Sequence, residues 1–480
     1  MQKKFIVNLL FLLLLNLLVK PFYILGIDAE ILNRVGPESY GNYFAIINFT
    51  FLLNIFLDLG ITNFNTKNIA QNQQLMGKHL SKVLSLKLLL SFFYILITLG
   101  LGFWWGFRSN EIHLLAFLAL NQSIVAVILY LRSNLSGLHM FKHDSLISIL
   151  DRLLLIIICS VLLWGGVTEQ AFQIEWFVYA QTFSYLITAI VTFLLLSSKT
   201  EKVKFSFNKV FSLMILKQSY PYALLVLLMS FYFRSDSVML EKMLEDGSKQ
   251  AGYYAQGYRF FEAANMIGYL FAALLLPIFS NMLKKKEAID DLVMLSFKLI
   301  FSGSLILCFA CYFFQDEIMA WKYDDIHHYS AVTFSVLMMC FVCVTTTYIF
   351  GTLLTANGNL KALNIMALGA VFVNVGLNLL LIPKYLALGS AVASLITQLF
   401  VTVAQVVLCK RYLNLKFPFV QIAQITGFSI VLLTIGFYSK DFFESWLLSM
   451  LAFIIVGFVL AIGIRMISIP GLYRIIKYDR

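Results

Sequence analysis

Long apolar runs, separated by short charged stretches, are the feature of this sequence that most restricts its fold. A helix needs about 20 mostly apolar residues to cross the roughly 30 Å hydrocarbon core of a bilayer. The 480 residues contain fourteen such runs, and only 13% of the residues are charged. Soluble domains carry about 25% charged residues. The sequence therefore predicts a protein that lies in a membrane.

Helices are the element expected in these runs, because lipid cannot satisfy backbone hydrogen bonds and the runs are too long for barrel strands. The predicted fold class is an all-α polytopic membrane protein with about fourteen transmembrane helices. The predicted spans are 5–27, 40–64, 82–106, 112–135, 145–165, 172–196, 213–235, 251–280, 292–314, 328–354, 362–382, 387–409, 418–437 and 444–466.

The charges between the runs alternate in sign, and they predict the orientation. Lysine and arginine collect in the even-numbered connections, as expected for cytoplasmic loops, for example at Lys67, Lys142, Lys202, Lys285 and Arg411. The odd-numbered connections are acidic, for example at Asp28, Glu38, Glu169, Glu245 and Asp324. Both termini are therefore expected to be cytoplasmic. The net charge of +11 follows from this distribution, so a nucleic-acid partner is not expected.

An internal repeat supports a two-half organisation. The segment Gly41–Phe49 resembles Gly252–Phe260 at an offset of 211 residues, and each opens the second span of a six-span block. Paired halves with a substrate site between them are a recurrent transporter plan. The predicted domains are two six-helix halves in pseudo-two-fold relation, 1–200 and 201–410, followed by two additional helices and a cytoplasmic tail in 411–480.

Three stretches together resemble the bacterial polysaccharide exporters, the O-antigen-type flippases of the multidrug/oligosaccharidyl-lipid/polysaccharide exporter superfamily. They run from Leu32 to Gly60, from Ser230 to Pro277 and from Phe350 to Pro383. In these exporters the twelfth span usually opens with Gly-Ala-Ala, and in this sequence it opens with Gly389-Ser390-Ala391. The resemblance implies movement of an undecaprenyl-diphosphate-linked oligosaccharide from the cytoplasmic to the periplasmic leaflet of a bacterial inner membrane. It also implies a polysaccharide polymerase and a chain-length regulator as partners.

Charged residues inside the apolar runs are the candidate functional residues. Each costs about 2.5–3.5 kcal/mol near a helix centre on insertion scales, so it is expected to face a cavity or a partner. Arginine presents a planar fork of donors that matches phosphate oxygens. The candidate diphosphate-binding cations are Lys20, Arg152, Arg234 and Arg259. The candidate gating or ion-coupling acids, which would keep the cavity from trapping an anion, are Asp58, Asp151, Asp236 and Glu262.

Each of these residues has a plainer interpretation. Arg259 and Glu262 stand three apart on one helix face, where they can neutralise each other. Asp58 lies near the cytoplasmic boundary and can extend to the interface. Asn374 and Asn378, four apart in one span, are candidate sugar contacts, but such pairs more often bridge helices. The six cysteines include two C-x-x-C spacings inside apolar runs, where cysteine acts as a small hydrophobe, so neither a metal nor another cofactor is expected.

Three alternatives to the polysaccharide flippase stay open. A lipid II flippase and a cation-coupled drug antiporter of the same superfamily share the architecture. A membrane enzyme, such as a polysaccharide polymerase or an acyltransferase, belongs to another class. The chain lacks the G-x-x-x-x-G-K-[ST] motif of an ATPase, and its outer connections are short for a polymerase. The sequence thus predicts a transporter that is not an enzyme.

Overall fold

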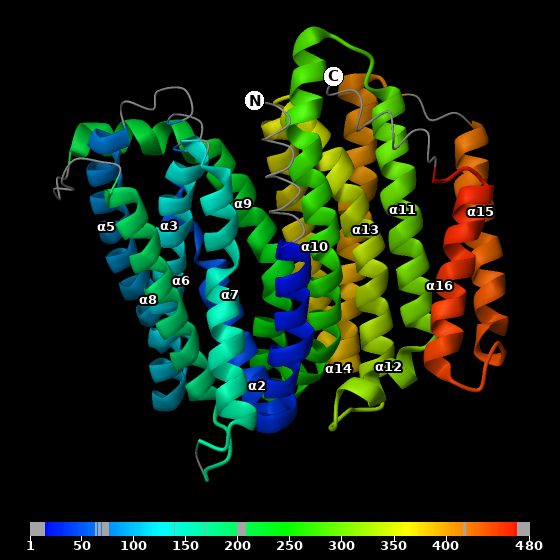
Figure 1. Cartoon of the computed structure of the whole chain (residues 1–480), viewed down its shortest axis with the longest axis horizontal. Helices are drawn as coiled ribbons and strands as arrows, with labels where there is room; N and C mark the ends of the chain where they lie inside the picture. The colour runs from blue at the N-terminus through cyan, green and yellow to red at the C-terminus, as the bar shows by residue number, and fades with distance from the viewer. Residues whose placement is uncertain are drawn as a thin grey trace. The chain divides into compact units, whose positions relative to one another are not determined.

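The computed structural model describes residues 15–62, 65, 69, 76–138, 140–167, 169–198, 208–415 and 419–467. These residues form helices and no strands, which confirms the all-α prediction (Figure 1). The chain begins with helical residues 15–22 and continues through η1 (Tyr23–Asp28), α2 (Ala29–Leu52), α3 (Ile55–Asp58), α5 (Met76–Trp104), α6 (Ser109–Gly137), α7 (Phe141–Trp164), α8 (Ile174–Ser197) and α9 (Lys209–Met243). It continues through α10 (Gly247–Lys285), α11 (Asp290–Phe313), α12 (Gln315–Lys322), α13 (Ser330–Ala356), α14 (Leu360–Leu413), α15 (Phe419–Tyr438), η3 (Ser439–Asp441) and α16 (Trp446–Gly463).

Eleven helices in the described part of the chain are long and apolar enough to cross a membrane. One of them, α14, has 54 residues and would be roughly 80 Å long at 1.5 Å per residue, far more than one crossing needs. Its path is interrupted at Leu386, whose φ is 54°. The interruption lies between the predicted spans 362–382 and 387–409. The total of fourteen spans stays a prediction, since part of the first two spans lies outside the described residues.

The described chain divides into two compact units, Met1–Gly252 and Tyr253–Arg480. Within the N-terminal unit, α6 packs on α8 and α5, and α9 packs along α2. This division separates groups of residues that contact one another, and its boundary falls inside α10. The predicted boundary at residue 200 was based on the sequence repeat instead. The predicted halves therefore stay a prediction.

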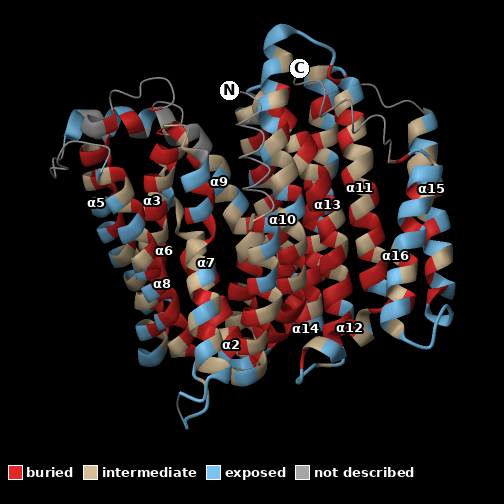
Figure 2. Ribbon diagram, viewed as in Figure 1, coloured by how far each residue is buried: buried red, intermediate tan, exposed pale blue. Residues whose placement is uncertain are grey.

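The C-terminal unit is built around α13 and α14, whose inward faces are buried (Figure 2). The last two long helices, α15 and α16, pack against α11. Small residues permit this contact, since a side chain at Gly436 would overlap the ring of Phe313. Lys298 of α11 donates a 2.7 Å hydrogen bond to the Gln424 side chain of α15. Lys298, a lysine inside the predicted span 292–314, thus joins this helix pair to the rest of its unit.

Large apolar side chains are exposed along the outer faces of the helices, for example Phe92, Ile157 and Phe372. Figure 2 shows further exposed positions in pale blue along α5, α15 and α16. A soluble protein rarely leaves contiguous apolar patches of this extent open, whereas hydrocarbon covers them at no cost. All six cysteines are buried in α7, α11, α13 and α14, in agreement with a packing role.

Candidate functional site

A break in the first span brings charged and aromatic side chains together in the N-terminal unit. The helix that begins before Tyr23 changes to a π-helix over Tyr23–Asp28 and returns to α-helical geometry at Ala29. Such π-turns occur often at functional sites, because the extra residue turns side chains out of the regular register. η1 contacts α7, and α7 carries the predicted residues Asp151 and Arg152.

Arg152 lies among aromatic rings at this break. Its guanidinium carbon is 4.8 Å from the centre of the Tyr23 ring and 5.9 Å from that of Tyr185 on α8. Rings placed in this way stabilise a cation by about 0.5–2 kcal/mol. The Nε atom of Arg152 is also 3.6 Å from an Asp151 carboxylate oxygen. The two tyrosines are almost fully buried, while Arg152 is half-buried.

Lys20 belongs to the same cluster. The ammonium group of Lys20 interacts electrostatically with Arg152 and Asp151, one turn before η1. A hydrogen bond of 3.0 Å from Asn16 to Ser148 fixes the preceding turn of this helix on α7. The structure therefore brings together three of the predicted residues, and we call Lys20, Asp151, Arg152, Tyr23 and Tyr185 the cationic cluster.

Asp28 differs from its sequence interpretation. It was expected in an acidic outer connection, yet it ends η1 in the middle of a helical path and only 2% of it is exposed. Its carboxylate accepts a 2.9 Å hydrogen bond from the Tyr40 hydroxyl, which lies 12 residues later on α2. The sequence did not reveal this burial, because the predicted first span ended at residue 27, whereas the helical path continues to an interruption at Gly36, with φ 79° and ψ 163°.

Arg234 and Asp236 lie on α9 in the N-terminal unit. Arg234 donates a 3.2 Å hydrogen bond to the Asn48 side chain of α2, and its guanidinium carbon is 4.7 Å from the centre of the Phe51 ring. Asp236 is 2% exposed. Arg234 thus faces α2, and Asp236 is buried in the interior of its unit.

Arg259 and Glu262 form an ion pair of 2.6 Å on α10, one turn apart. Arg259 is 8% exposed. In this conformation the two charges neutralise each other, which is the plainer of the two interpretations that the sequence left open. Any contact of Arg259 with a ligand would require competition with Glu262.

Asn374 and Asn378 lie on α14 and are fully buried. The amide of Asn378 donates to Asn374 at 3.2 Å, and its oxygen accepts from Ser390 at 2.9 Å. Ser390 follows the interruption at Leu386, so this chain of hydrogen bonds connects the two segments of α14. The geometry agrees with the helix-bridging interpretation, and a contact with sugar stays a prediction.

Asp58 is paired with a residue that the sequence analysis missed. Lys87, at the centre of α5, is fully buried and hydrogen-bonds to the Asp58 carboxylate. Asp58 therefore does not reach the interface alone, as its position near the boundary had suggested. The cost of placing a charge in an apolar run selected Lys20, and the same argument applied to the run 82–106 would have selected Lys87.

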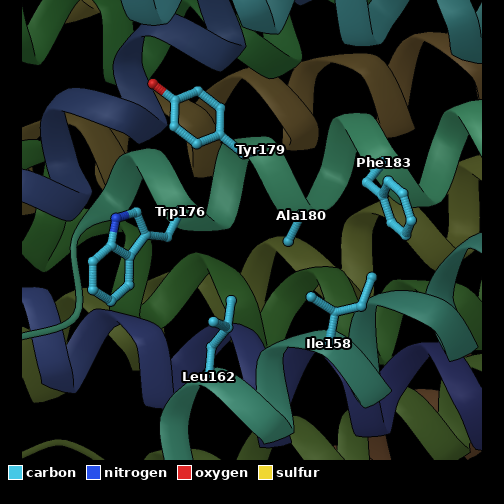
Figure 3. A pocket seen from close by; sticks show the side chains of 6 residues that line it. All are labelled: Ile158, Leu162, Trp176, Tyr179, Ala180 and Phe183. Atoms are coloured by element: carbon cyan, nitrogen blue, oxygen red, sulfur yellow. The ribbon is translucent and has the colours of Figure 1, made fainter. Parts of the chain in front are cut away.

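An apolar cavity of about 310 Å³ lies between α7 and α8. Figure 3 shows its lining, with Ile158 and Leu162 from α7 and Trp176, Tyr179, Ala180 and Phe183 from α8. None of these six lining side chains is charged, so the cavity offers no cation to a phosphate. Its chemistry fits hydrocarbon, and the candidate site remains the cationic cluster.

The comparisons with known proteins agree with this architecture. The chain resembles the solved structure of the lipid II flippase MurJ in an inward closed conformation, with a TM-score of 0.73, 18% identity, and 96% of this chain and 98% of that chain covered. It also resembles an inward-facing multidrug resistance MATE family transporter of the MOP superfamily, with a TM-score of 0.63, 14% identity and coverage of 82% and 95%. A MOP superfamily transporter from Pyrococcus furiosus gives a TM-score of 0.59, 16% identity and coverage of 85% and 94%.

At these identities the likeness concerns the fold. The comparison with curated proteins gives no match. Family membership comes from a separate finding, because the model of the family described as "Polysaccharide biosynthesis protein" matches residues 6–283, more than half of the chain. This protein belongs to the polysaccharide biosynthesis protein family and has the fold of the multidrug/oligosaccharidyl-lipid/polysaccharide exporter superfamily.

Proposed function

We propose that this protein is a flippase. It moves an undecaprenyl-diphosphate-linked oligosaccharide, such as an O-antigen or another surface polysaccharide repeat unit, from the cytoplasmic to the periplasmic leaflet by alternating access. The membrane is a bacterial inner membrane, and both termini are cytoplasmic. Membership of a polysaccharide biosynthesis family supports the substrate class, and the transporter fold supports the process.

The observation that carries the proposal is the cationic cluster. A diphosphate loses hydration when it leaves water, and that loss must be offset by donors fixed in place. Lys20 and Arg152 are two cations of one unit that interact electrostatically. Because their charges have the same sign, this interaction is a repulsion. Asp151 lies beside Arg152 and reduces the net charge without cancelling it. A mobile anion that enters such a site relieves the repulsion, and an aspartate in the site helps the anion to leave again.

The acids supply the coupling in this proposal. Asp236 and Glu262 are candidates for a coupling proton or cation, since the chain has no nucleotide-binding motif. Flipping should then respond to a proton or sodium gradient. A rate that is unchanged after both gradients are collapsed would exclude this role for the two acids.

The test is flipping by the purified, full-length protein in vesicles. An undecaprenyl-diphosphate oligosaccharide is placed in one leaflet, and its arrival in the other is followed with an impermeant sugar-oxidising reagent. Wild-type protein should accelerate its transfer, and Arg152→Gln should slow it. The control is Arg34→Gln, which removes an arginine of an exposed pair with Glu30. Equal rates for wild type, Arg152→Gln and empty vesicles would overturn the proposal.

A lipid II flippase is the second candidate, and the likeness to MurJ over 96% of the chain favours it. The same vesicles separate the two when lipid II replaces the oligosaccharide lipid. A drug antiporter would instead move an organic cation against a gradient. A membrane polymerase or acyltransferase would change the mass of the lipid-linked sugar, which a flippase leaves intact.

A polysaccharide polymerase and a chain-length regulator are the partners that the proposed substrate implies. Both would act on the translocated lipid at the periplasmic face. Co-purification of the full-length protein from membranes with either partner tests this association.

A further inference from the structure

The second predicted span is broken near its cytoplasmic end. α2 ends at Leu52, a turn at Leu53 and Asn54 follows, and α3 provides a single turn, Ile55–Asp58. The next residue, Leu59, has a φ of 46°, in the left-handed region. Leucine is disfavoured there, since its Cβ approaches the following carbonyl oxygen. Contacts with the rest of the unit must therefore hold this segment in place.

Lys87 provides such contacts from α5. Its ammonium group donates a 3.0 Å hydrogen bond to the carbonyl oxygen of Leu57 and a second hydrogen bond to the carboxylate of Asp58. The carbonyl of Leu57 belongs to the last turn before the break, where backbone acceptors lose their helical partners. One side chain thus satisfies an acceptor that the break leaves open.

Asp58 extends the contact across the break. Its carboxylate accepts hydrogen bonds from the backbone N–H of Thr62, at 3.2 Å, and from the Thr62 hydroxyl. The helical path resumes at residues 61–62. Lys87 and Asp58 therefore connect the turn before Leu59 with the turn after it, and they hold the two segments at a fixed angle.

The two partners differ in exposure. The side chain of Lys87 is fully buried, whereas 34% of the Asp58 side chain is exposed. Asp58 can change partner, while Lys87 stays in the protein interior. A buried ion pair is weak evidence for a role in stability alone, because apolar residues of similar size often serve as well. A charged pair at a helix break is suited to a segment that must take two arrangements.

We propose that Lys87 is a positioning residue for transport, an inference that rests on the proposed function. Through Leu57 and Asp58 it holds the segment Leu53–Thr62 in its bent arrangement. Separation of the Lys87–Asp58 pair releases this segment during the transport cycle. Lys87 itself does not contact the lipid-linked sugar.

The test compares Lys87→Met, Asp58→Asn and the double variant, each as full-length protein in vesicles. Lys87→Met should lower the flipping rate at saturating substrate by about tenfold or more, the effect of a lost charged hydrogen bond, with an unchanged KM. The double variant leaves no unpaired buried charge, so its thermal stability should return to that of wild type while its rate stays low. Recovery of the rate in the double variant, or a wild-type rate for Lys87→Met, would overturn the inference. Lys440→Met, which removes one partner of an exposed pair with Glu317, is the control and should match wild type.

A second measurement separates this inference from the proposed function. Hydrogen exchange of Leu53–Thr62 needs no substrate, and it should be faster in Lys87→Met than in wild type while exchange in α16 is unchanged. Equal exchange of the segment in the two proteins overturns the inference even if wild type flips the oligosaccharide lipid. Wild-type protein that fails to flip the lipid refutes the proposed function, and faster exchange in the variant would still support the positioning of the segment by Lys87.

Discussion

Gly41 and Gly252 are packed against each other's helices in a symmetric contact. A Cβ atom on Gly41 would overlap the carbonyl oxygen of Ser248, and a Cβ atom on Gly252 would overlap that of Pro37. Ser248 follows Pro37 by the same 211 residues that separate Gly252 from Gly41. The two glycines that open the repeated segments therefore lie at one close helix crossing, and a side chain at either position would meet backbone atoms.

The first prediction concerns this crossing. Gly41→Ala and Gly252→Ala should each destabilise the protein by about 1–3 kcal/mol, the usual cost of overpacking, because backbone atoms cannot rotate away. Thermal unfolding of the purified variants measures the effect. Gly100→Ala is the matched control, since Gly100 lies in α5 with open space around it. Unfolding temperatures that agree among all three variants would refute the close packing.

The second prediction separates two properties of Arg152 in the cationic cluster, its positive charge and its planar guanidinium group. Arg152→Lys keeps the charge but loses the planar fork that lies near Tyr23 and Tyr185. Its flipping rate should fall between those of wild type and Arg152→Gln, and the wild-type rate should exceed that of Arg152→Gln by about tenfold to a hundredfold. Initial rates in vesicles, scaled to the amount of inserted protein, give the order. Identical rates for the lysine and glutamine variants would mean that charge at this position does not matter.

The third prediction uses the pair of Arg259 and Glu262. Glu262→Gln removes the carboxylate that lies 2.6 Å from the guanidinium and that would compete with a phosphate for it. The substrate KM should fall and the maximal rate should fall with it, because a bound diphosphate is released more slowly. Binding and initial-rate curves check both values. In Glu30→Gln, which alters an exposed pair of similar spacing, neither value should move, and a wild-type KM for Glu262→Gln would assign the pair to structure alone.

The fourth prediction concerns the hydrogen-bonded chain in α14. Asn378→Ala removes two hydrogen bonds at a fully buried position and should lower stability by about 1–3 kcal/mol. Asn357→Ala, at an exposed position after α13, should be close to neutral. Thermal unfolding and the substrate KM are measured together. A raised KM with an unchanged unfolding temperature would instead support the sugar contact predicted from the sequence.

Individual elements show how far sequence reasoning reached. The apolar runs predicted helices at α5 to α8 because burial in hydrocarbon depends on local composition. The repeat at Gly41 and Gly252 was visible in the sequence, although its close contact was not. Arg259 and Glu262 were predicted as neighbours because a helix brings residues three apart together. Asp28 was placed wrongly in an outer connection, since the predicted span ended at residue 27, whereas the helical path continues past Asp28 to the interruption at Gly36.

The sequence by itself determined the all-helical membrane class, the family and the residues whose burial demands an explanation. These follow from composition, from short spacings and from resemblance, and each of the three can be read from short stretches of the sequence. Only the tertiary structure decided which partner each buried charge has. Lys87 and Asp58 are 29 residues apart, and Arg234 and Asn48 are 186 apart. Such pairs depend on how distant helices pack and on where a helix breaks. Neither the packing nor the position of the break is encoded in any single stretch of the chain.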